Sequence, residues 1–363
     1  MPRYRGRVSA RRDPVADLRE IAFLLERGLE STYRVRAYRG AANALDELDA
    51  DEIAARVADG TLTKIKGIGA STAGAVAESL RGEVPAALAK LQSVEPEPVN
   101  AAVAAVRAAL LGDCHSHSDW SDGGSPIKEM ALAARTIGHD YLVLTDHSPR
   151  LTVANGLSAE RLEEQLDLVA GLNEEFAAQA AAGDARAFRL LTGIEVDILE
   201  DGTLDQKPSL LARLDLVVAS VHSKLRMPAA EMTPRMIAAI ANPHTDVLGH
   251  CTGRLVTGGR GTRPESEFDP ELVFAACEAF GVAVEINSRP ERLDPPDNLL
   301  AMAVEAGCIF SIDTDAHAPG QLDWQVNGCE KAVACDIAAD RIVNTWTEEN
   351  LLAWTADHSV VTQ

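Results

Sequence analysis

The chain has 363 residues, of which 46% are hydrophobic and 25% are charged, and its formal net charge is −21. A chain of this length can bury a large core, and it suits one large domain together with a smaller one. Such an acidic protein is poorly suited to coat nucleic acid without specificity.

The sequence has no feature typical of a membrane or secreted protein. No apolar run reaches the length of a membrane span, and the N-terminal residues MPRYRGRVSARRD lack the apolar segment of a signal peptide. The six cysteines have no paired or framework spacing, which favours reduced thiols. We therefore expect a cytoplasmic protein without membrane contact. The sequence carries no signal for a particular oligomeric state.

The charge is spread unevenly along the chain. Residues 1–81 hold 14 Lys and Arg against 12 Asp and Glu, a net charge of +2. The rest of the chain holds 20 against 43, a net charge of −23. A mildly basic small module therefore precedes a strongly acidic large one, in which bound cations could offset part of the charge.

The first 92 residues have the pattern of a small helical domain. Asp13 is placed to cap a helix that begins at Pro14, and further helical patterns cover RVRAYRGAANALDEL and DEIAARVADG. In LTKIKGIGASTAGAVAESL, a tight turn at Gly67–Ile68–Gly69 separates a short helix from a longer one, which is typical of a helix-hairpin-helix element. We assign residues 13–92 to a small all-α domain and residues 93–110 to a linker.

From residue 111 onward, apolar runs rich in β-branched residues alternate with helical patterns. The helical segments include 125–137, 158–181, 270–280 and 297–306, and the apolar runs cover 111–115, 141–145, 190–197, 214–221, 246–249, 282–286 and 308–313. Seven strands that each precede a helix or a loop predict a parallel sheet that closes, or nearly closes, like a TIM barrel. We therefore expect an α/β fold over residues 111–355.

Histidines and carboxylates stand at the C-terminal ends of these runs. Six of the nine histidines lie there, in the segments LLGDCHSH, YLVLTDH, SVHS, VLGH and SIDTDAH, and GIEVDI adds an acidic residue. In a βα-barrel, the loops at this end of the strands converge on one mouth, where active sites form. Imidazole and carboxylate without paired thiolates suit Zn²⁺, Mn²⁺ or Fe²⁺ in an open catalytic site. The pattern predicts a metal site.

These motifs resemble the PHP (polymerase and histidinol phosphatase) family, most closely the PHP domains attached to bacterial X-family DNA polymerases. The motifs DCHSHSDWSDG, TDHS, GIEVDI, SVHS, GHCTGR, EINSRPERLD and SIDTDAH occur in the family's order over residues 111–355. The resemblance implies a distorted seven-stranded (β/α) barrel and two to three divalent ions, Zn or Mn, with Fe as a further candidate. It also implies a hydrolase that cleaves phosphoester bonds with a metal-activated water.

Matched position by position, the resemblance implies three sets of metal ligands. A first ion would be held by His115, His117, Glu195 and Asp315, a second by Glu195, His222 and His250, and a third by Asp122, His147 and His317. Every ligand position of the family pattern is filled. Arg254, in GHCTGR, is the candidate catalytic contact to the substrate phosphate, because a guanidinium fork matches phosphate oxygens. A salt bridge at the rim is the alternative role for Arg254.

Residues 15–81 resemble the N-terminal eight-kilodalton domain of X-family polymerases, which binds DNA near a gap or an end. The resemblance rests on YRVRAYRGAANAL and LTKIKGIGASTAGAVAESL, and it implies DNA contacts from Arg34, Arg36, Arg39, Lys66, Gly67 and Gly69. The glycines let the hairpin backbone approach a phosphate, and the next helix presents free N–H groups and the positive end of its dipole. A plain tight turn between packed helices is the alternative interpretation.

Two departures separate the chain from those polymerases. Ala75 stands where the family has the lysine nucleophile of deoxyribose-phosphate lyase, and Ser71 stands where it has a phosphate-binding lysine. Because a Schiff base needs an amine, we expect no lyase activity by that route. Only residues 81–111 join the two motif-bearing regions, which is too few for a nucleotidyl-transfer domain, so no polymerase palm separates them.

The sequence therefore predicts a metal-dependent phosphoesterase that acts on DNA, with a role in DNA repair. The expected reactions are 3′–5′ exonuclease activity, 3′-end processing or abasic-site cleavage. A small-molecule phosphomonoesterase of the histidinol-phosphatase type is the alternative, which the acidic large domain favours because it repels polyanions. A DNA-binding scaffold with structural metals is a third reading, which the open and complete ligand set disfavours. We prefer DNA, because a small-molecule phosphatase has no use for a helix-hairpin-helix element.

Overall fold

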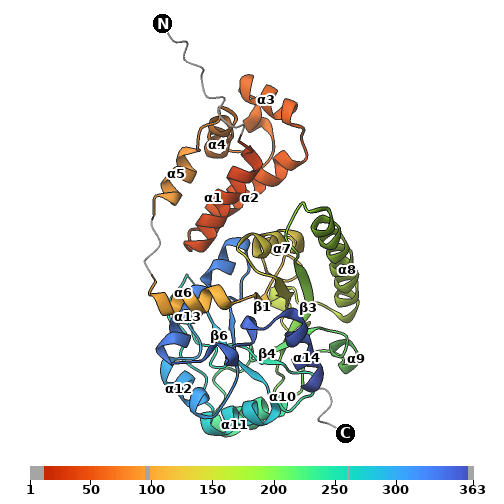
Figure 1. Ribbon diagram of the computed structural model, residues 1–363, viewed down its shortest axis with the longest axis vertical. Coiled ribbons are helices and arrows are strands. Elements are labelled where there is room, and N and C mark those ends of the chain that lie inside the picture. Colours follow the sequence, from red (N-terminus) through yellow and green to blue (C-terminus); the bar gives the residue numbers. More distant parts are fainter. Residues whose placement is uncertain (1–11, 95–98, 260, 359–363) are drawn as a thin grey trace. The chain divides into compact units, whose positions relative to one another are not determined.

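The computed structural model describes residues 12–94, 99–259 and 261–358 (Figure 1). The described residues divide into two compact units, with the boundary between residues 98 and 99. Among the described residues, none of the helices combines the length and the apolar character that crossing a bilayer requires.

The N-terminal unit is all-α. Its helices α1 to α5 span Pro14–Arg27, Thr32–Asp46, Ala50–Ala58, Ala70–Leu80 and Ala86–Gln92, and a 3₁₀ turn covers Leu62–Lys64. Asp13 caps α1 by accepting a hydrogen bond from Val15 N, and Pro14 begins the helix, as predicted. The apolar stripe of α1, which includes Leu18 and Ile21, is fully buried in the core of this unit.

The C-terminal unit is a seven-stranded parallel barrel, as predicted. Strands β1 to β7 span Gly112–Ser116, Tyr141–Leu144, Arg189–Asp197, Leu216–Ser220, Val247–Leu248, Ala283–Asn287 and Phe310–Asp313. Strands that are neighbours in the chain are neighbours in the sheet, and every pair is parallel. Every residue of β1, β4 and β6 is buried, because a parallel sheet of this kind is covered on its outer face and packed on its inner face.

Helices lie around these strands (Figure 1). Helices α6 to α14 span Ala101–Ala109, Ile127–Thr136, Ala159–Ala182, Pro208–Leu211, Ala229–Ile240, Pro270–Phe280, Asp297–Glu305, Gln325–Ala334 and Glu348–His358. Short 3₁₀ turns cover Thr152–Ala154, Pro319–Trp324, Ala339–Arg341 and Val343–Thr345. Helix α6 lies within the predicted linker; it packs against α13, and its Val103 is buried in the barrel core.

The barrel closes between its first and last strands through a bridge and side-chain hydrogen bonds. Ser116 and Ala316 form a single parallel bridge. Gln325 Nε2 donates to the carbonyl oxygens of Gly112 in β1 and Ile312 in β7, each at 2.9 Å. A side chain therefore links the first and last strands of the barrel.

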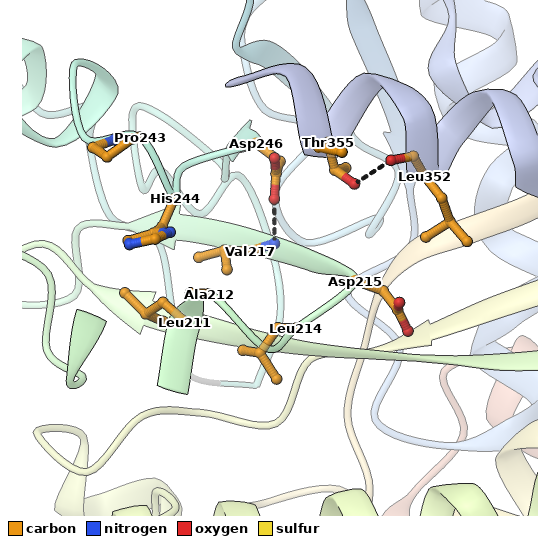
Figure 2. A pocket seen from close by; sticks show the side chains of 11 residues that line it. Leu211, Ala212, Leu214, Asp215, Val217, Pro243, His244, Asp246, Leu352 and Thr355 are labelled. Carbon is orange, nitrogen blue, oxygen red and sulfur yellow. Dashed lines mark hydrogen bonds between the residues drawn. The ribbon is translucent and has the colours of Figure 1, made fainter. Parts of the chain in front are cut away.

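A cavity of about 340 Å³ lies at the N-terminal ends of β4 and β5 (Figure 2). Asp246 lines it with a side chain that is nearly buried, and Asp246 Oδ2 accepts a hydrogen bond from Val217 N at 2.7 Å. Burial raises the pKa of Asp246 well above its ordinary value, and the hydrogen bond from Val217 N opposes this shift only in part. The folded protein therefore favours the neutral acid.

Replacing Asp246 with Asn should remove a pH-dependent loss of stability. Because the pKa of Asp246 is higher in the folded than in the unfolded chain, the wild type loses stability as pH rises from the unfolded pKa through the folded one. Asn keeps an acceptor for Val217 N and has no charge to bury. We expect Asp246→Asn to be more stable by about 1 to 3 kcal/mol at pH 8, with a smaller gap at pH 4.5. Chemical denaturation at both pH values measures the gap; a gap that does not grow with pH would contradict the assignment.

Candidate metal centre

The nine predicted metal ligands gather at the C-terminal end of the barrel. In a parallel barrel the C-terminal ends of all strands meet at one mouth, so residues far apart in sequence come together there. His115 and Glu195 lie inside β1 and β3, and the others lie in the loops that follow the strands, namely His117, Asp122, His147, His222, His250, Asp315 and His317.

Local backbone conformation helps to aim these side chains. Asp315 and His250 have positive φ values of 51° and 20°, which are uncommon for residues other than glycine and cluster at functional sites. In the loop after β1, a Cβ atom on Gly123 would lie 2.6 Å from Ser118 O. Only glycine therefore fits the turn that brings Asp122 to the barrel mouth.

Glu195 lies at the centre of five imidazole rings. Its Oε1 lies 2.9 Å from His250 Nε2 and 3.2 Å from His222 Nε2. Its Oε2 lies 2.8 Å from His147 Nδ1, 3.4 Å from His115 Nε2 and 3.5 Å from His117 Nε2. Burial acts to raise the pKa of Glu195, but the surrounding histidines outweigh it and hold that pKa well below its usual range. The carboxylate is therefore charged, and its role as a bridge between two cations stays a prediction.

Two further carboxylates face predicted ligand histidines, one of which, His317, is not among the five rings around Glu195. Asp122 Oδ1 lies 3.3 Å from His317 Nε2 and 3.5 Å from His147 Nε2. Asp315 Oδ1 lies 3.4 Å from His117 Nε2. Together with Glu195, these aspartates give the centre three carboxylates.

Eight of the nine predicted ligands fall into three groups, each of which could hold an ion, and His250 belongs to none of these groups. The groups are His117 with Asp122, His147 and His317; His115 with His117 and Asp315; and His147 with Glu195 and His222. Each contains at least two members of one predicted ligand set, but His117 and His147 each belong to two groups. The side chains are together, and their division among individual ions stays a prediction.

The chemistry of the buried atoms fits a metal. Among the described residues, the buried side-chain atoms that lack a hydrogen bond of good geometry include His115 Nε2, both ring nitrogens of His117 and His222, His147 Nδ1, His250 Nδ1 and Glu195 Oε2. Buried polar atoms nearly always have partners, and their concentration at one place needs an explanation. Imidazole nitrogens and carboxylate oxygens are ligands of Zn²⁺ and related ions, so a divalent cation would satisfy these atoms together.

Protonation equilibria differ among the rings. Burial is the largest effect on His117 and His250, and it lowers their pKa values to about 3 and about 4, so both rings are neutral and keep a lone pair for a metal. Burial also acts to lower the pKa of His222, but the charges of Glu195 and Asp197 raise it to about 9. A cation bound beside His222 would have to displace that proton.

Two other acidic residues, Glu285 and Asp197, lie beside ligand histidines. His115 Nδ1 lies 2.6 Å from Glu285 Oε1. Asp197 Oδ1 lies 3.6 Å from His222 Nδ1 and accepts a hydrogen bond from the backbone N of His222 at 3.0 Å. A carboxylate on the second nitrogen of a ligand histidine fixes its tautomer and strengthens it as a ligand. Sequence reasoning missed Glu285, although a single acid inside the apolar run that forms β6 is a signal that could have found it.

Arg254, the predicted phosphate contact, donates to protein groups. Its Nε donates to Arg292 O at 3.0 Å, its Nη2 donates to Leu293 O, and its Nη1 lies 3.3 Å from Glu265 Oε1. These bonds attach Arg254 to the loop that follows β6. A direct phosphate contact by Arg254 stays a prediction.

The predicted DNA contacts of the N-terminal unit divide into exposed and paired residues. Arg36, Lys66, Gly67 and Gly69 are exposed, and Arg34 is exposed beside Glu30, 2.7 Å away. In contrast, Arg39 is largely buried, because its guanidinium forms a two-pronged salt bridge with Glu26 at 2.9 and 2.7 Å. The structure thus gives Arg39 a role in packing and leaves the other five as the accessible candidates.

The hairpin itself has the predicted geometry. Gly67 has a φ of 96°, which favours glycine, and Gly69 precedes the first residue of α4. Ile68, between them, is buried and anchors the turn in the core. The exposed glycines on either side leave the backbone open to an approaching phosphate.

We expect no covalent adduct when the protein meets a 5′-deoxyribose-phosphate end in the presence of borohydride. Ala75 is buried and has no amine, and Ser71 Oγ lies 3.2 Å from Tyr38 OH, so neither can form the Schiff base that borohydride traps. Gel electrophoresis after trapping measures this, with a polymerase that carries the lysine as the positive control. A crosslinked product would show that another amine serves as the nucleophile.

Comparison with known proteins identifies two families and several relatives. The PHP domain matches residues 113–288, and the helix-hairpin-helix domain matches residues 9–84. The DNA polymerase/3′-5′ exonuclease PolX of Bacillus subtilis is 41% identical over 223 residues, which cover 61% of this chain. The chain spans only 37% of the length of that relative.

Shorter relatives match over most of their length. A protein of Vibrio parahaemolyticus named "Probable phosphatase" is 30% identical over 256 residues, which cover 67% of this chain and 92% of the relative. Among solved structures, the histidinol phosphate phosphatase of Lactococcus lactis, complexed with zinc, L-histidinol and phosphate, is 18% identical with a TM-score of 0.43. That match covers 62% of this chain and 91% of the other.

Proposed function

Because the chain belongs to the PHP family of phosphoesterases, we propose that it is a metal-dependent hydrolase that cleaves phosphoester bonds of DNA at ends or lesions. The reactions proposed are 3′–5′ exonuclease activity, 3′-end processing and abasic-site cleavage. The observation that carries the proposal is the set of buried, unpartnered imidazole and carboxylate atoms around Glu195. The metal content proposed is two to three ions of Zn or Mn, with Fe as a further candidate.

The ligand residues and the acidic residues beside them have distinct roles in this reaction. Divalent ions at such a centre lower the pKa of water and stabilise charge on the oxygens of a phosphoester. His117 and His250 supply neutral nitrogens as ligands, whereas His115 and His222, whose pKa values the neighbouring carboxylates raise, would supply theirs once a cation displaces a proton. Glu195 supplies negative charge that attracts cations. Glu285 holds the ring of His115 in a fixed orientation, and Asp197 holds the backbone of His222, so that little reorganisation is needed when the substrate arrives.

The helix-hairpin-helix unit supports DNA as the substrate. Its exposed Lys66, Gly67 and Gly69 offer a cation and open backbone to a phosphate, and Arg34 and Arg36 on α2 add positive charge. The B. subtilis relative is named as a 3′–5′ exonuclease and is similar to this chain in sequence. We propose that this unit delivers a strand end to the barrel, in the cytoplasm.

A second candidate is a small-molecule phosphomonoesterase of the histidinol-phosphatase type. The observation that favours it is the net charge of −23 on residues 82–363, which repels a polyanion. The helix-hairpin-helix unit weighs against it, because a small phosphate ester needs no such unit.

One comparison of substrates separates the two candidates. Purified protein loaded with Mn²⁺ or Zn²⁺ is incubated with end-labelled DNA, with DNA carrying an abasic site and with histidinol phosphate. We expect DNA cleavage that is lost in the His222→Ala variant, with little turnover of histidinol phosphate. Turnover of histidinol phosphate alone, with DNA untouched, would reject the DNA proposal and favour the second candidate.

A further inference from the structure

Arg292 lies against the carboxylates of the metal centre. It is in the loop after β6, its side chain is 12% exposed, and its Nε donates to Asp315 Oδ2 at 3.1 Å. Among the described residues, its Nη1 is a buried donor without a hydrogen-bond partner. A buried N–H group of a charged side chain that lacks a partner is costly, so a site that keeps one is expected to provide an acceptor at some stage of its function.

The positive charge of this guanidinium interacts with charged groups of the metal centre. Burial acts to lower the pKa of Arg292, but the charges of Asp315 and Glu195 raise it above its ordinary value. The positive charge of Arg292 also contributes to the low pKa of His250, after the larger effect of burial. Arg292 is thus within the electrostatic reach of three predicted ligands.

Two contacts hold the loop that carries Arg292. Arg254 binds the carbonyl oxygens of Arg292 and Leu293, and Thr252 Oγ1 donates to Asp294 Oδ2 at 2.6 Å. Both contacts come from the loop after β5. These hydrogen bonds join the two loops, and the guanidinium of Arg254 makes two of them.

A neighbouring arginine in the same loop does not offer a comparable donor. Arg289 Nε donates to Glu291 Oε2 at 2.7 Å, and Arg289 Nη1 donates to Asp315 O at 2.9 Å. Its guanidinium also lies over the ring of Trp324, 5.7 Å from the centroid. These contacts make Arg289 part of the wall of the site.

We propose that Arg292 binds the phosphoryl group of the substrate and that Arg254 acts through it as a positioning residue. This inference rests on the proposed phosphoesterase function. A guanidinium next to the ligand cluster can donate to phosphoryl oxygens while the metals bind others, which matches the geometry that phosphate recognition requires. Because Arg292 Nε occupies Asp315 Oδ2, Asp315 keeps Oδ1 for a metal. Arg292 therefore connects the phosphoryl group to the metal centre through Asp315.

Binding of inorganic phosphate tests this without relying on turnover. Full-length protein is loaded with Zn²⁺, freed of excess metal and titrated with phosphate by calorimetry. We expect Arg292→Gln and Arg292→Lys to weaken phosphate binding by about 10- to 100-fold, because Lys keeps the charge but loses the fork. Metal content and thermal midpoint, measured on the same samples, should stay close to the wild type. Arg226→Gln, which removes an exposed arginine from the loop after β4, serves as the matched control and should bind phosphate within twofold of the wild type.

A double-mutant cycle tests the role of Arg254. Arg254→Gln alone should weaken phosphate binding, but added to Arg292→Gln it should weaken binding no further, since Arg254 acts through Arg292. Independent, additive losses would show that Arg254 itself contacts phosphate, as the sequence predicted, and would overturn the positioning role.

Two further results would overturn the proposal for Arg292, and a third would reject the function on which it rests. Phosphate binding by Arg292→Gln within twofold of the wild type would overturn the proposal for Arg292. A loss of metal in proportion to the loss of phosphate binding would also overturn the proposal, because Arg292 would then act only by stabilising the metal ligands. A metal-loaded wild type that binds no phosphate would instead reject the phosphoesterase function on which the inference rests.

Discussion

The Glu195→Gln variant is expected to lose at least about 10³-fold in phosphoester hydrolysis, equivalent to about 4 kcal/mol of transition-state stabilisation. Gln has nearly the same size, but it lacks the charge that five imidazole rings surround and that would draw two cations together. We also expect the purified variant to hold less metal. Elemental analysis and an assay on end-labelled DNA measure the two effects.

The matched control is Glu163→Gln, which makes the same chemical change at an exposed salt bridge with Arg213. That variant should keep both metal and activity, because exposed ion pairs contribute little. If Glu195→Gln kept the metal content and the rate of the wild type, Glu195 could not be the bridging ligand.

Removing divalent metal should lower the stability of the wild type by several kcal/mol. Without metal, the buried ring nitrogens of His117 and His222 lack partners, and any ligand that binds the folded chain alone stabilises it by mass action. For a metal present at 1,000 times its dissociation constant, this effect is about 4 kcal/mol. We expect a chelator to lower the thermal midpoint and Zn²⁺ or Mn²⁺ to restore it, as measured by differential scanning fluorimetry.

The Glu195→Gln variant provides the control for this shift. Since it should hold less metal, its thermal midpoint should respond much less to the chelator. A wild type whose thermal midpoint is the same with chelator and with added metal would mean that these atoms are satisfied in some other way.

The fold and the gathering of the histidines at one mouth could be predicted from local sequence pattern, whereas the individual ligand sets are implied by the family resemblance. Each apolar run of the barrel yielded a strand, and even the two-residue β5 lies inside its predicted range. Parallel strands place their C-terminal ends together, so histidines at those ends had to converge. This rule needs no knowledge of distances, which is why His115 and His317 could be assigned to one centre.

The contacts that shape the site depend on residues far apart in the chain, and sequence pattern does not report them. Glu285 lies beside His115, which is 170 positions earlier, and a lone acid within an apolar run gives no hint of its partner. Arg254 binds the carbonyl oxygen of Arg292, 38 positions later. Arg39 forms a salt bridge with Glu26 on a neighbouring helix, so it is not among the exposed candidates for DNA contact. Residue type could be read from the sequence, but pairing could not.

The most direct test of the account is the recovery of hydrolysis as metal is returned to the protein. Chelated protein is titrated with Zn²⁺ or Mn²⁺ while the metal bound per chain and the cleavage of end-labelled DNA are measured on the same samples. The account predicts two to three ions per chain at saturation and a rate that rises with their binding, and it predicts no such rise for Glu195→Gln. Cleavage of DNA by fully chelated protein at the rate of the loaded protein would contradict it.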